Sequence, residues 1–131
     1  MRRVTGIGGI FFKARDAEAL REWYRRHLGL DVKEWGGVTF HWQPSDELRT
    51  EGATVWTIFP MSSTYFAPSS TPFMVNYRVE NLVALLEALR AEGCSVDDRT
   101  ETSEFGKFGW VMDPEGNRIE LWEPPAGRFP G

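Results

Sequence analysis

The hydrophobic pattern of this chain changes period twice, each time in the same order. An apolar, strand-like run over residues 7–14 gives way to apolar positions that recur at helical spacing. The segment 73–96 repeats this order of strand, amphipathic helix and closing glycine. Asp16 and Gly29 each have a counterpart 64 residues later, an acid and a glycine respectively. A common offset at two landmarks predicts an internal repeat, and hence two copies of one structural unit.

Capping residues mark the ends of both predicted helices. Asp16 is suited to the N-cap of the first helix, and Gly29 to the residue just beyond its last turn. The second helix begins at Glu80 or Asn81, carries leucines along one face, and ends at Gly93. Each helix therefore has one apolar side to bury against a sheet.

Three further strand-like segments follow each helix, separated by turn-forming residues. In chain order they are 31–35, 38–42 and 54–59, then 95–100, 108–112 and 118–122. We therefore expect an α+β fold of two tandem β-α-β-β-β modules, at about 4–59 and 73–123, within a single domain over 1–131. The modules are joined by a linker over 60–72, and one helix per module leaves one face of the curved, open sheet exposed as a cleft.

Composition excludes several classes of function. The 131 residues carry a formal net charge of -4 and no basic cluster, so we expect no nucleic-acid partner. No apolar run approaches the roughly 20 residues of a membrane span, and the N-terminus does not resemble a secretory signal. We therefore expect no membrane partner and a cytoplasmic location. Cys94 is the single cysteine, which excludes an intramolecular disulfide and thiolate metal clusters.

Two segments carry a family resemblance. The helix DAEALREWYRRHLGL and the hairpin DPEGNRIELWEP, together with the repeat, resemble the vicinal oxygen chelate superfamily. That superfamily includes glyoxalase I, extradiol dioxygenases, fosfomycin-resistance enzymes and bleomycin-binding proteins. The resemblance implies the glyoxalase/bleomycin-resistance/dioxygenase fold and a homodimer. In metal-using members it also implies ligands on the first and last strands of each half, which hold a metal that binds two adjacent oxygens of the substrate.

The four ligand positions that the resemblance implies are largely empty here. The first strands place Gly9 in one half and Met74 or Phe73 in the other. The last strands place Trp56 or Thr57 in one half and Glu120 in the other. A catalytic transition metal generally needs about three protein ligands, so a lone carboxylate predicts no metal and no other cofactor.

The two histidines do not restore a metal site. His27 falls in the last turn of the first helix, where a helix-capping or solvent-exposed role is favoured. His41 lies between two aromatic residues on a middle strand, far in sequence from any other ligand, which favours a structural or pocket-lining role.

Strand alternation predicts which side chains face the cleft. Taking the empty ligand positions as references, we expect an aromatic-rich face with a few polar groups, as in small-molecule pockets. Asn76 and Glu120 are the strongest candidates, because each is polar within an otherwise apolar strand. The predicted ligand-binding residues are Phe11, Trp56, Met74, Asn76, Trp110, Arg118, Glu120 and Trp122.

Three functions are compatible with this sequence. The favoured one is a metal-free protein that binds an aromatic or amphipathic small molecule in the cleft of the sheet. The first alternative is a glyoxalase- or dioxygenase-like enzyme with an atypical metal site or with Glu120 as a general base. The second alternative is an assembly subunit without a ligand.

Overall fold

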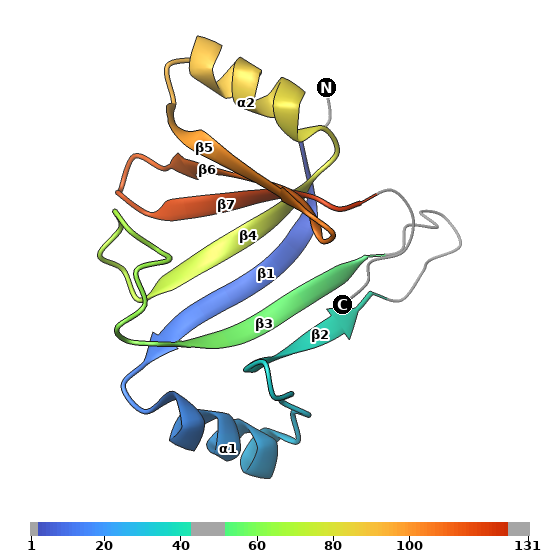
Figure 1. Cartoon of the computed structure of the whole chain (residues 1–131), viewed down its shortest axis with the longest axis vertical. Helices are drawn as coiled ribbons and strands as arrows, with labels where there is room; N and C mark the ends of the chain where they lie inside the picture. The colour runs from blue at the N-terminus through green and yellow to red at the C-terminus, as the bar shows by residue number, and fades with distance from the viewer. Residues whose placement is uncertain (1–2, 43–51, 126–131) are drawn as a thin grey trace.

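The computed structural model describes residues 3–42 and 52–125, which form one curved sheet and two helices (Figure 1). The first half comprises β1 (Val4–Ala14), α1 (Ala17–Leu28), β2 (Gly37–His41) and β3 (Ala53–Pro60). The second comprises β4 (Phe73–Val79), α2 (Leu82–Ala91), β5 (Ser95–Ser103), β6 (Gly106–Met112) and β7 (Arg118–Glu123). The predicted α+β class with a curved, open sheet is confirmed.

The sheet joins the two halves through their first strands. The strand order is β2-β3-β1-β4-β7-β6-β5, with β1 antiparallel to β4 at the centre. Within each half the first strand runs parallel to the last one, as β1 with β3 and β4 with β7. This arrangement brings strands from both halves to the middle of one sheet, where the predicted polar residues lie.

The ends of the helices follow the predicted capping residues. Asp16 accepts a hydrogen bond from the Ala19 backbone N–H at 3.0 Å, and Gly29 adopts the left-handed conformation after α1. Of the two residues that could begin the second helix, Asn81 is the N-cap. Gly93 has a φ of 85° just beyond α2, a conformation that glycine adopts without strain.

The strand predicted over 31–35 does not form, so the described part of the first half contains three strands rather than four. The segment closes on itself instead: the Gly36 N–H donates to the Lys33 carbonyl and the Lys33 N–H to the Gly37 carbonyl, each at 2.9 Å. The Val32 carbonyl accepts hydrogen bonds from the Arg25 guanidinium of α1. These backbone groups are thus satisfied by a turn and by a helix side chain, not by a neighbouring strand.

Both helices pack on the convex face of the sheet. Under α2, buried Leu82, Leu85 and Leu86 form a cluster with Val79 and Leu121 of the sheet. The register aligns Ile10 of β1 with Val75 of β4, and Val75 with Ile119 of β7, so the helix-facing side chains of the two halves share one face. The concave face is left to the candidate site.

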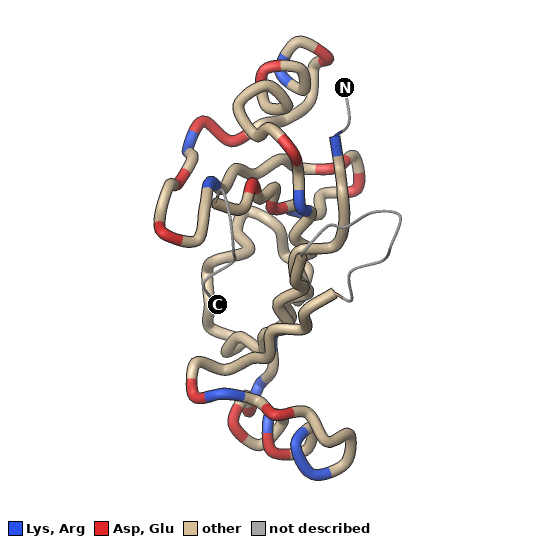
Figure 2. The backbone as a smooth tube through the Cα atoms, turned by 90° about the vertical axis from the view of Figure 1, so that its right-hand side faces the viewer, with Lys and Arg blue, Asp and Glu red and all other residues tan. Residues whose placement is uncertain are grey.

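Charge is distributed in keeping with this layering. Figure 2 shows acidic and basic residues gathered on both helices and along the β5 side, whereas the central strands carry few. Within the described ranges, no helix is long and apolar enough to cross a membrane.

Candidate functional site

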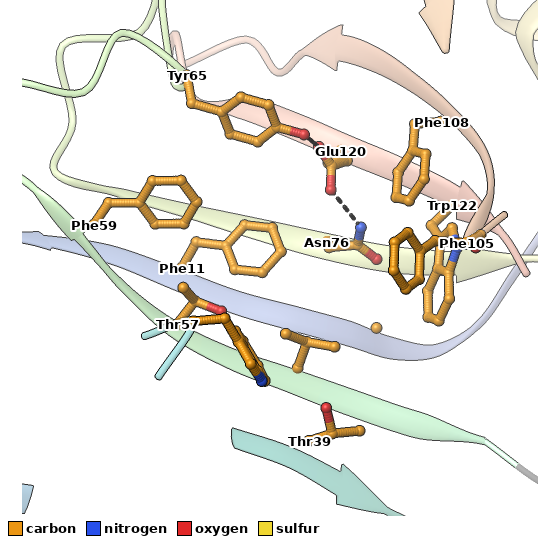
Figure 3. Close-up of a pocket in the computed structure, with 13 residues that line it drawn as sticks. Phe11, Thr39, Thr57, Phe59, Tyr65, Asn76, Phe105, Phe108, Glu120 and Trp122 are labelled. Carbon is orange, nitrogen blue, oxygen red and sulfur yellow. Dashed lines mark hydrogen bonds between the residues drawn. The ribbon is translucent and has the colours of Figure 1, made fainter. Parts of the chain in front are cut away.

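A cavity of about 670 Å³ lies on the concave face of the sheet (Figure 3). This volume is within the range of small-molecule sites. Strands of both halves and the segments beside them contribute to its walls, which are mainly aromatic. The lining residues are Gly8, Phe11, Trp35, Thr39, Val55, Thr57, Phe59, Tyr65, Asn76, Phe105, Phe108, Glu120 and Trp122.

Strand register places the polar groups of the site side by side. Asn76 of β4 is paired with Gly9 of β1 on one side and with Glu120 of β7 on the other. Trp110 of β6 is the cross-strand partner of Glu120. Figure 3 shows Asn76 and Glu120 between the phenylalanines of β1 and β3 and the aromatic group around Trp122. The polar centre of the cavity is therefore built from the middle of the sheet.

Glu120 is the centre of a hydrogen-bond network. Its side chain is buried, with 2% of the residue surface exposed. Oε2 accepts hydrogen bonds from the Tyr65 hydroxyl and, at 2.9 Å, from Trp110 Nε1. Oε1 accepts from Asn76 Nδ2 at 2.7 Å. Three donors from three different segments thus converge on one carboxylate, and each stabilises its ionised form.

Burial and hydrogen bonding act in opposite directions on Glu120. Burial raises the pKa of Glu120 above its usual range, because the charged form loses its hydration. The bonds from Tyr65, Asn76 and Trp110, and the nearby charge of Arg118, lower it and offset part of that rise. Tyr65 is itself shifted, since burial and the neighbouring carboxylate raise the pKa of its hydroxyl, which therefore remains a proton donor in hydrogen bonds at neutral pH.

Asn76 has one satisfied end and one unsatisfied end. Its Nδ2 donates to Glu120, whereas its Oδ1 is buried and has no hydrogen-bond partner in the described part of the chain. This oxygen lies over Gly8, where an added Cβ would come within 2.2 Å of it. An unpaired buried acceptor costs about 1–3 kcal/mol, so this oxygen is a marked polar feature of the cavity wall.

The donor set around Glu120 does not fit a divalent metal. By register, the positions in line with Glu120 across the sheet are Trp110, Asn76, Gly9 and Val55, of which only Asn76 carries a side-chain atom that could ligate a metal. The carboxylate oxygens are already occupied by three N–H and O–H donors, which a cation would have to displace. Over residues 3–42 and 52–125, no three His, Cys, Asp or Glu side chains gather closely enough to hold a metal ion.

Half of the predicted site residues line the cavity. They are Phe11, Asn76, Glu120 and Trp122. They come from three adjacent strands, and the same alternation that identified them places them on one face of the sheet.

The prediction that Trp56 faces the cleft is wrong. Trp56 packs against Phe12 and against Tyr24 of α1, with ring centroids 5.4 Å and 4.8 Å apart, and so lies on the helix side of the sheet. The reason is the register, because Trp56 is aligned with Ile10 whereas Thr57 is aligned with Phe11. Of the two residues considered for that ligand position, Thr57 is the one in the cavity.

Met74, Trp110 and Arg118 are not among the lining residues, although Trp110 contacts the polar network. Met74 and Trp110 are buried in a cluster with Phe11 and Phe66, a residue of the linker between the halves. The Arg118 guanidinium stacks on the Trp110 ring at 4.7 Å and donates to the Tyr65 carbonyl. These three side chains therefore pack against residues of the cavity wall and of the linker and do not line the cavity themselves.

Several lining residues were not predicted from the sequence. Phe59 and Phe108 could have been found, because each lies two positions from a residue, Thr57 and Trp110, that was already considered for the site. Tyr65 could not, since it lies in the linker, where no periodic pattern fixes the direction of a side chain. Its role depends on a contact with Glu120, 55 residues away.

Comparison with known proteins gives a family and a fold. A family model described as a glyoxalase-like domain matches residues 9–122. No curated protein matches the chain. Among solved structures, methylmalonyl-CoA epimerase from Mycobacterium tuberculosis is 19% identical, with a TM-score of 0.63 over 95% of this chain and 91% of that chain.

Two further structural matches cover a similar share of both chains. A Streptomyces coelicolor methylmalonyl-CoA epimerase variant in complex with 2-nitronate-propionyl-CoA is 18% identical, with a TM-score of 0.68 over 97% of this chain and 99% of that chain. A protein described as NAD-dependent benzaldehyde dehydrogenase from Legionella pneumophila is 11% identical, with a TM-score of 0.58 over 89% and 98% of the two chains. At these identities the likeness is one of fold.

Proposed function

The chain belongs to the glyoxalase-like domain family, of the vicinal oxygen chelate superfamily that its sequence resembles, and on this premise we propose that it is a small-molecule-binding protein. It binds a planar aromatic or amphipathic ligand in the concave cavity without a metal ion. The observation that carries this proposal is the cavity itself: about 670 Å³, walled by aromatic side chains, with a small polar group at Asn76 and Glu120. Apolar walls supply affinity, and sparse polar groups orient the ligand.

The donor chemistry supports the metal-free form of this proposal. Among the lining residues that the structure describes, Glu120 is the only carboxylate, and its hydrogen bonds hold it in place as a structural acceptor. The same bonds favour a positioning role over that of a general base, because a base needs a free lone pair directed at the substrate proton. The notable feature of the site is therefore its shape and its aromatic surface.

A fluorescence titration tests binding in the cavity. 4-Nitroaniline, a planar, neutral ring that is itself non-fluorescent, is expected to quench the emission of Trp122 and Trp35, whose rings line the cavity. The quenching should be reduced in Trp122→Phe and retained in Trp23→Phe, since Trp23 lies on α1 and is 48% exposed. Absence of any response in the wild-type protein would contradict the proposal.

A second variant tests the location without relying on fluorescence. Thr57→Phe places a ring in the cavity from β3, and we expect it to weaken binding by about tenfold or more by filling space that the ligand needs. Metal analysis of protein purified without chelator completes the test. Stoichiometric zinc, nickel, manganese or iron would contradict the metal-free reading.

The solved structures suggest a competing ligand class. The Streptomyces coelicolor variant named above is in complex with 2-nitronate-propionyl-CoA, and another matching methylmalonyl-CoA epimerase structure is in complex with methylmalonyl-CoA. Methylmalonyl-CoA therefore belongs in the titration. Tighter binding of this anion than of neutral 4-nitroaniline would favour a CoA ester as the ligand of this chain.

We propose a homodimer as the assembly. The convex face leaves Ile10 and Phe73 41% and 47% exposed between the two helices. Sedimentation equilibrium across a range of concentrations measures the assembly directly. A single species with the mass of one chain would contradict the dimer.

A further inference from the structure

We propose that the cavity selects ligands that donate a hydrogen bond, because Glu120 turns the Asn76 side chain so that its oxygen, not its nitrogen, faces the ligand. This inference rests on the proposed binding function and names the ligand class: a planar aromatic molecule with an N–H or O–H group. It assigns to Asn76 Oδ1 the contact with that group and to Glu120 the role of a positioning residue.

The orientation of Glu120 is fixed from one side by obligate donors. The indole N–H of Trp110 can only donate, and it lies 2.9 Å from Oε2. The Tyr65 hydroxyl donates to the same oxygen. Trp110 therefore requires an unprotonated oxygen at this position. With Glu120 ionised, the form that its three hydrogen bonds favour, Oε1 is a second acceptor and faces Asn76.

The orientation of Asn76 follows from that of Glu120. A side-chain amide has a donor end and an acceptor end, and a carboxylate oxygen can only accept. Nδ2 must therefore face Glu120 Oε1, at 2.7 Å, and Oδ1 must point the other way. There it lies over Gly8 and beside the Trp122 ring, buried and without a partner among the described residues. A ligand donor would satisfy it.

The remaining polar side chains on the lining do not select between donors and acceptors. Thr39 and Thr57 carry hydroxyl groups, which both donate and accept. Tyr65 is directed to Glu120, so its hydroxyl hydrogen is already used. The Trp122 N–H donates to the Phe105 carbonyl at 2.7 Å, and Trp35 is 54% exposed, so water can accept from its N–H. Discrimination by hydrogen bonding therefore falls on Asn76, and a site built around an acceptor rejects analogues that lack the matching donor.

Indole and benzofuran test this selection, because they have nearly the same shape and differ in an N–H against an oxygen. Isothermal titration calorimetry is expected to show that wild-type protein binds indole about tenfold more tightly than benzofuran. Equal affinities, or tighter binding of benzofuran, would overturn the inference and leave the proposed binding function intact. If neither compound binds, the binding function fails and the inference fails with it.

Glu120→Gln is expected to abolish or reverse the preference. The glutamine oxygen takes the place of Oε2 and accepts from Trp110 and Tyr65, so its NH₂ group faces Asn76. Asn76 must then turn its oxygen towards Gln and its NH₂ group towards Gly8, which replaces the acceptor of the cavity by a donor. Glu87→Gln, on the exposed side of α2, makes the same change of charge away from the cavity and should keep the preference for indole.

A measurement without ligand gives an independent readout. In the nuclear Overhauser spectrum, contacts between the Asn76 side-chain amide hydrogens and the Gly8 Hα atoms should be several-fold stronger in Glu120→Gln than in the wild type, where the Asn76 oxygen is the atom nearest Gly8. Equal intensities in the two proteins would overturn the inference. If the variant does not fold, the wild-type ligand pair decides the matter on its own.

Discussion

Glu120 is almost completely shielded from solvent, and protein side chains donate the hydrogen bonds that water would otherwise donate. It is 2% exposed, yet side chains from the linker, β4 and β6 donate three hydrogen bonds to it. Charge-assisted bonds of this kind offset much of the cost of burying a carboxylate. Removal of one donor leaves part of that cost uncompensated, so the network is expected to be sensitive to single substitutions.

Tyr65→Phe tests that sensitivity with a minimal change. The variant loses the hydroxyl that donates to Glu120 and should be less stable by about 1–3 kcal/mol in urea unfolding. Tyr77→Phe is the matched control, since Tyr77 packs beside the α2 cluster on the other face of the sheet and should have a much smaller effect. Equal losses in the two variants would show that the Tyr65 hydroxyl has no special role.

The titration of Glu120 should make the stability of the folded protein depend on pH. Burial raises the pKa of Glu120 in the folded protein above its ordinary value of 4.5, so between these two values the folded state holds more protons than the unfolded state. The associated stability is present below pH 4.5 and is lost as the pH rises through the raised pKa. In urea unfolding at several pH values, the free energy of unfolding of the wild type should therefore fall as the pH rises through the raised pKa of Glu120. Glu120→Gln should lack this fall. Glu87→Gln controls for the change of net charge, and an unchanged pH profile in Glu120→Gln would contradict the prediction.

Gly8 is expected to be intolerant of even a methyl group. An added Cβ would lie 2.2 Å from Asn76 Oδ1 and 2.8 Å from the Trp122 ring, so both side chains would have to move. We expect Gly8→Ala to lose about 1–3 kcal/mol of stability in urea unfolding and to weaken indole binding. Wild-type stability together with wild-type affinity would show that the Asn76 side chain is not held over Gly8.

Residue-level chemistry was predictable where a polar side chain interrupts an apolar strand. Asn76 and Glu120 were identified on that basis, and both line the cavity. Their partner Tyr65 was not, because a linker has no alternation from which to read the direction of a side chain. The hydrogen bond between Asn76 and Glu120 also depends on strand pairing across 44 residues of sequence, which composition and periodicity do not determine.

At the scale of single elements, alternation specifies which residues share a face but not which face that is. Trp56 shows the difference: its strand, β3, was predicted correctly, and its side chain was placed on the wrong face. The register of β3 against β1 decides the matter, and a shift of one residue exchanges Trp56 with Thr57. The strand predicted over 31–35 failed for another reason, since the Arg25 side chain and a turn took up its backbone hydrogen bonds.

The linker between β3 and β4 acts as a structural element of the site. Phe66 is fully buried among Phe59, Tyr65 and the cluster of Met74 and Trp110, and it holds the segment that carries Tyr65 to Glu120. We expect Phe66→Ala to cost about 3–5 kcal/mol in urea unfolding and to weaken ligand binding by releasing Tyr65.

Phe40→Ala is the matched control for this element. Phe40 lies on β2, is 43% exposed and does not line the cavity, so its truncation should have a much smaller effect on stability and none on binding. If Phe66→Ala destabilised the protein without any change in affinity, the linker would be a part of the core and not of the site.

For the whole molecule, the sequence repeat predicted the architecture correctly but not the differences between the two halves. The offset of 64 residues located both helices and the first strand of each half. The halves then diverge: over residues 3–42 and 52–60 the first has three strands, whereas the second has four. The cavity lies where they meet, and its polar centre comes mainly from the second half, so the site depends on divergence that the repeat pattern does not specify.

The net charge of the molecule should act on ligands together with the local carboxylate. The chain carries a formal charge of -4, and the part of it that Glu120 contributes when ionised is buried at the cavity wall. Indole-3-acetate should therefore bind more weakly than indole-3-acetamide, which has a similar shape and no charge. Added salt screens the field of the exposed charges but affects a buried charge much less. Calorimetry at about 0.02 M and 0.5 M salt should therefore recover only part of the difference, and Glu120→Gln should recover most of the remainder. A difference that disappears at high salt in the wild type would assign the discrimination to the surface of the molecule and not to Glu120.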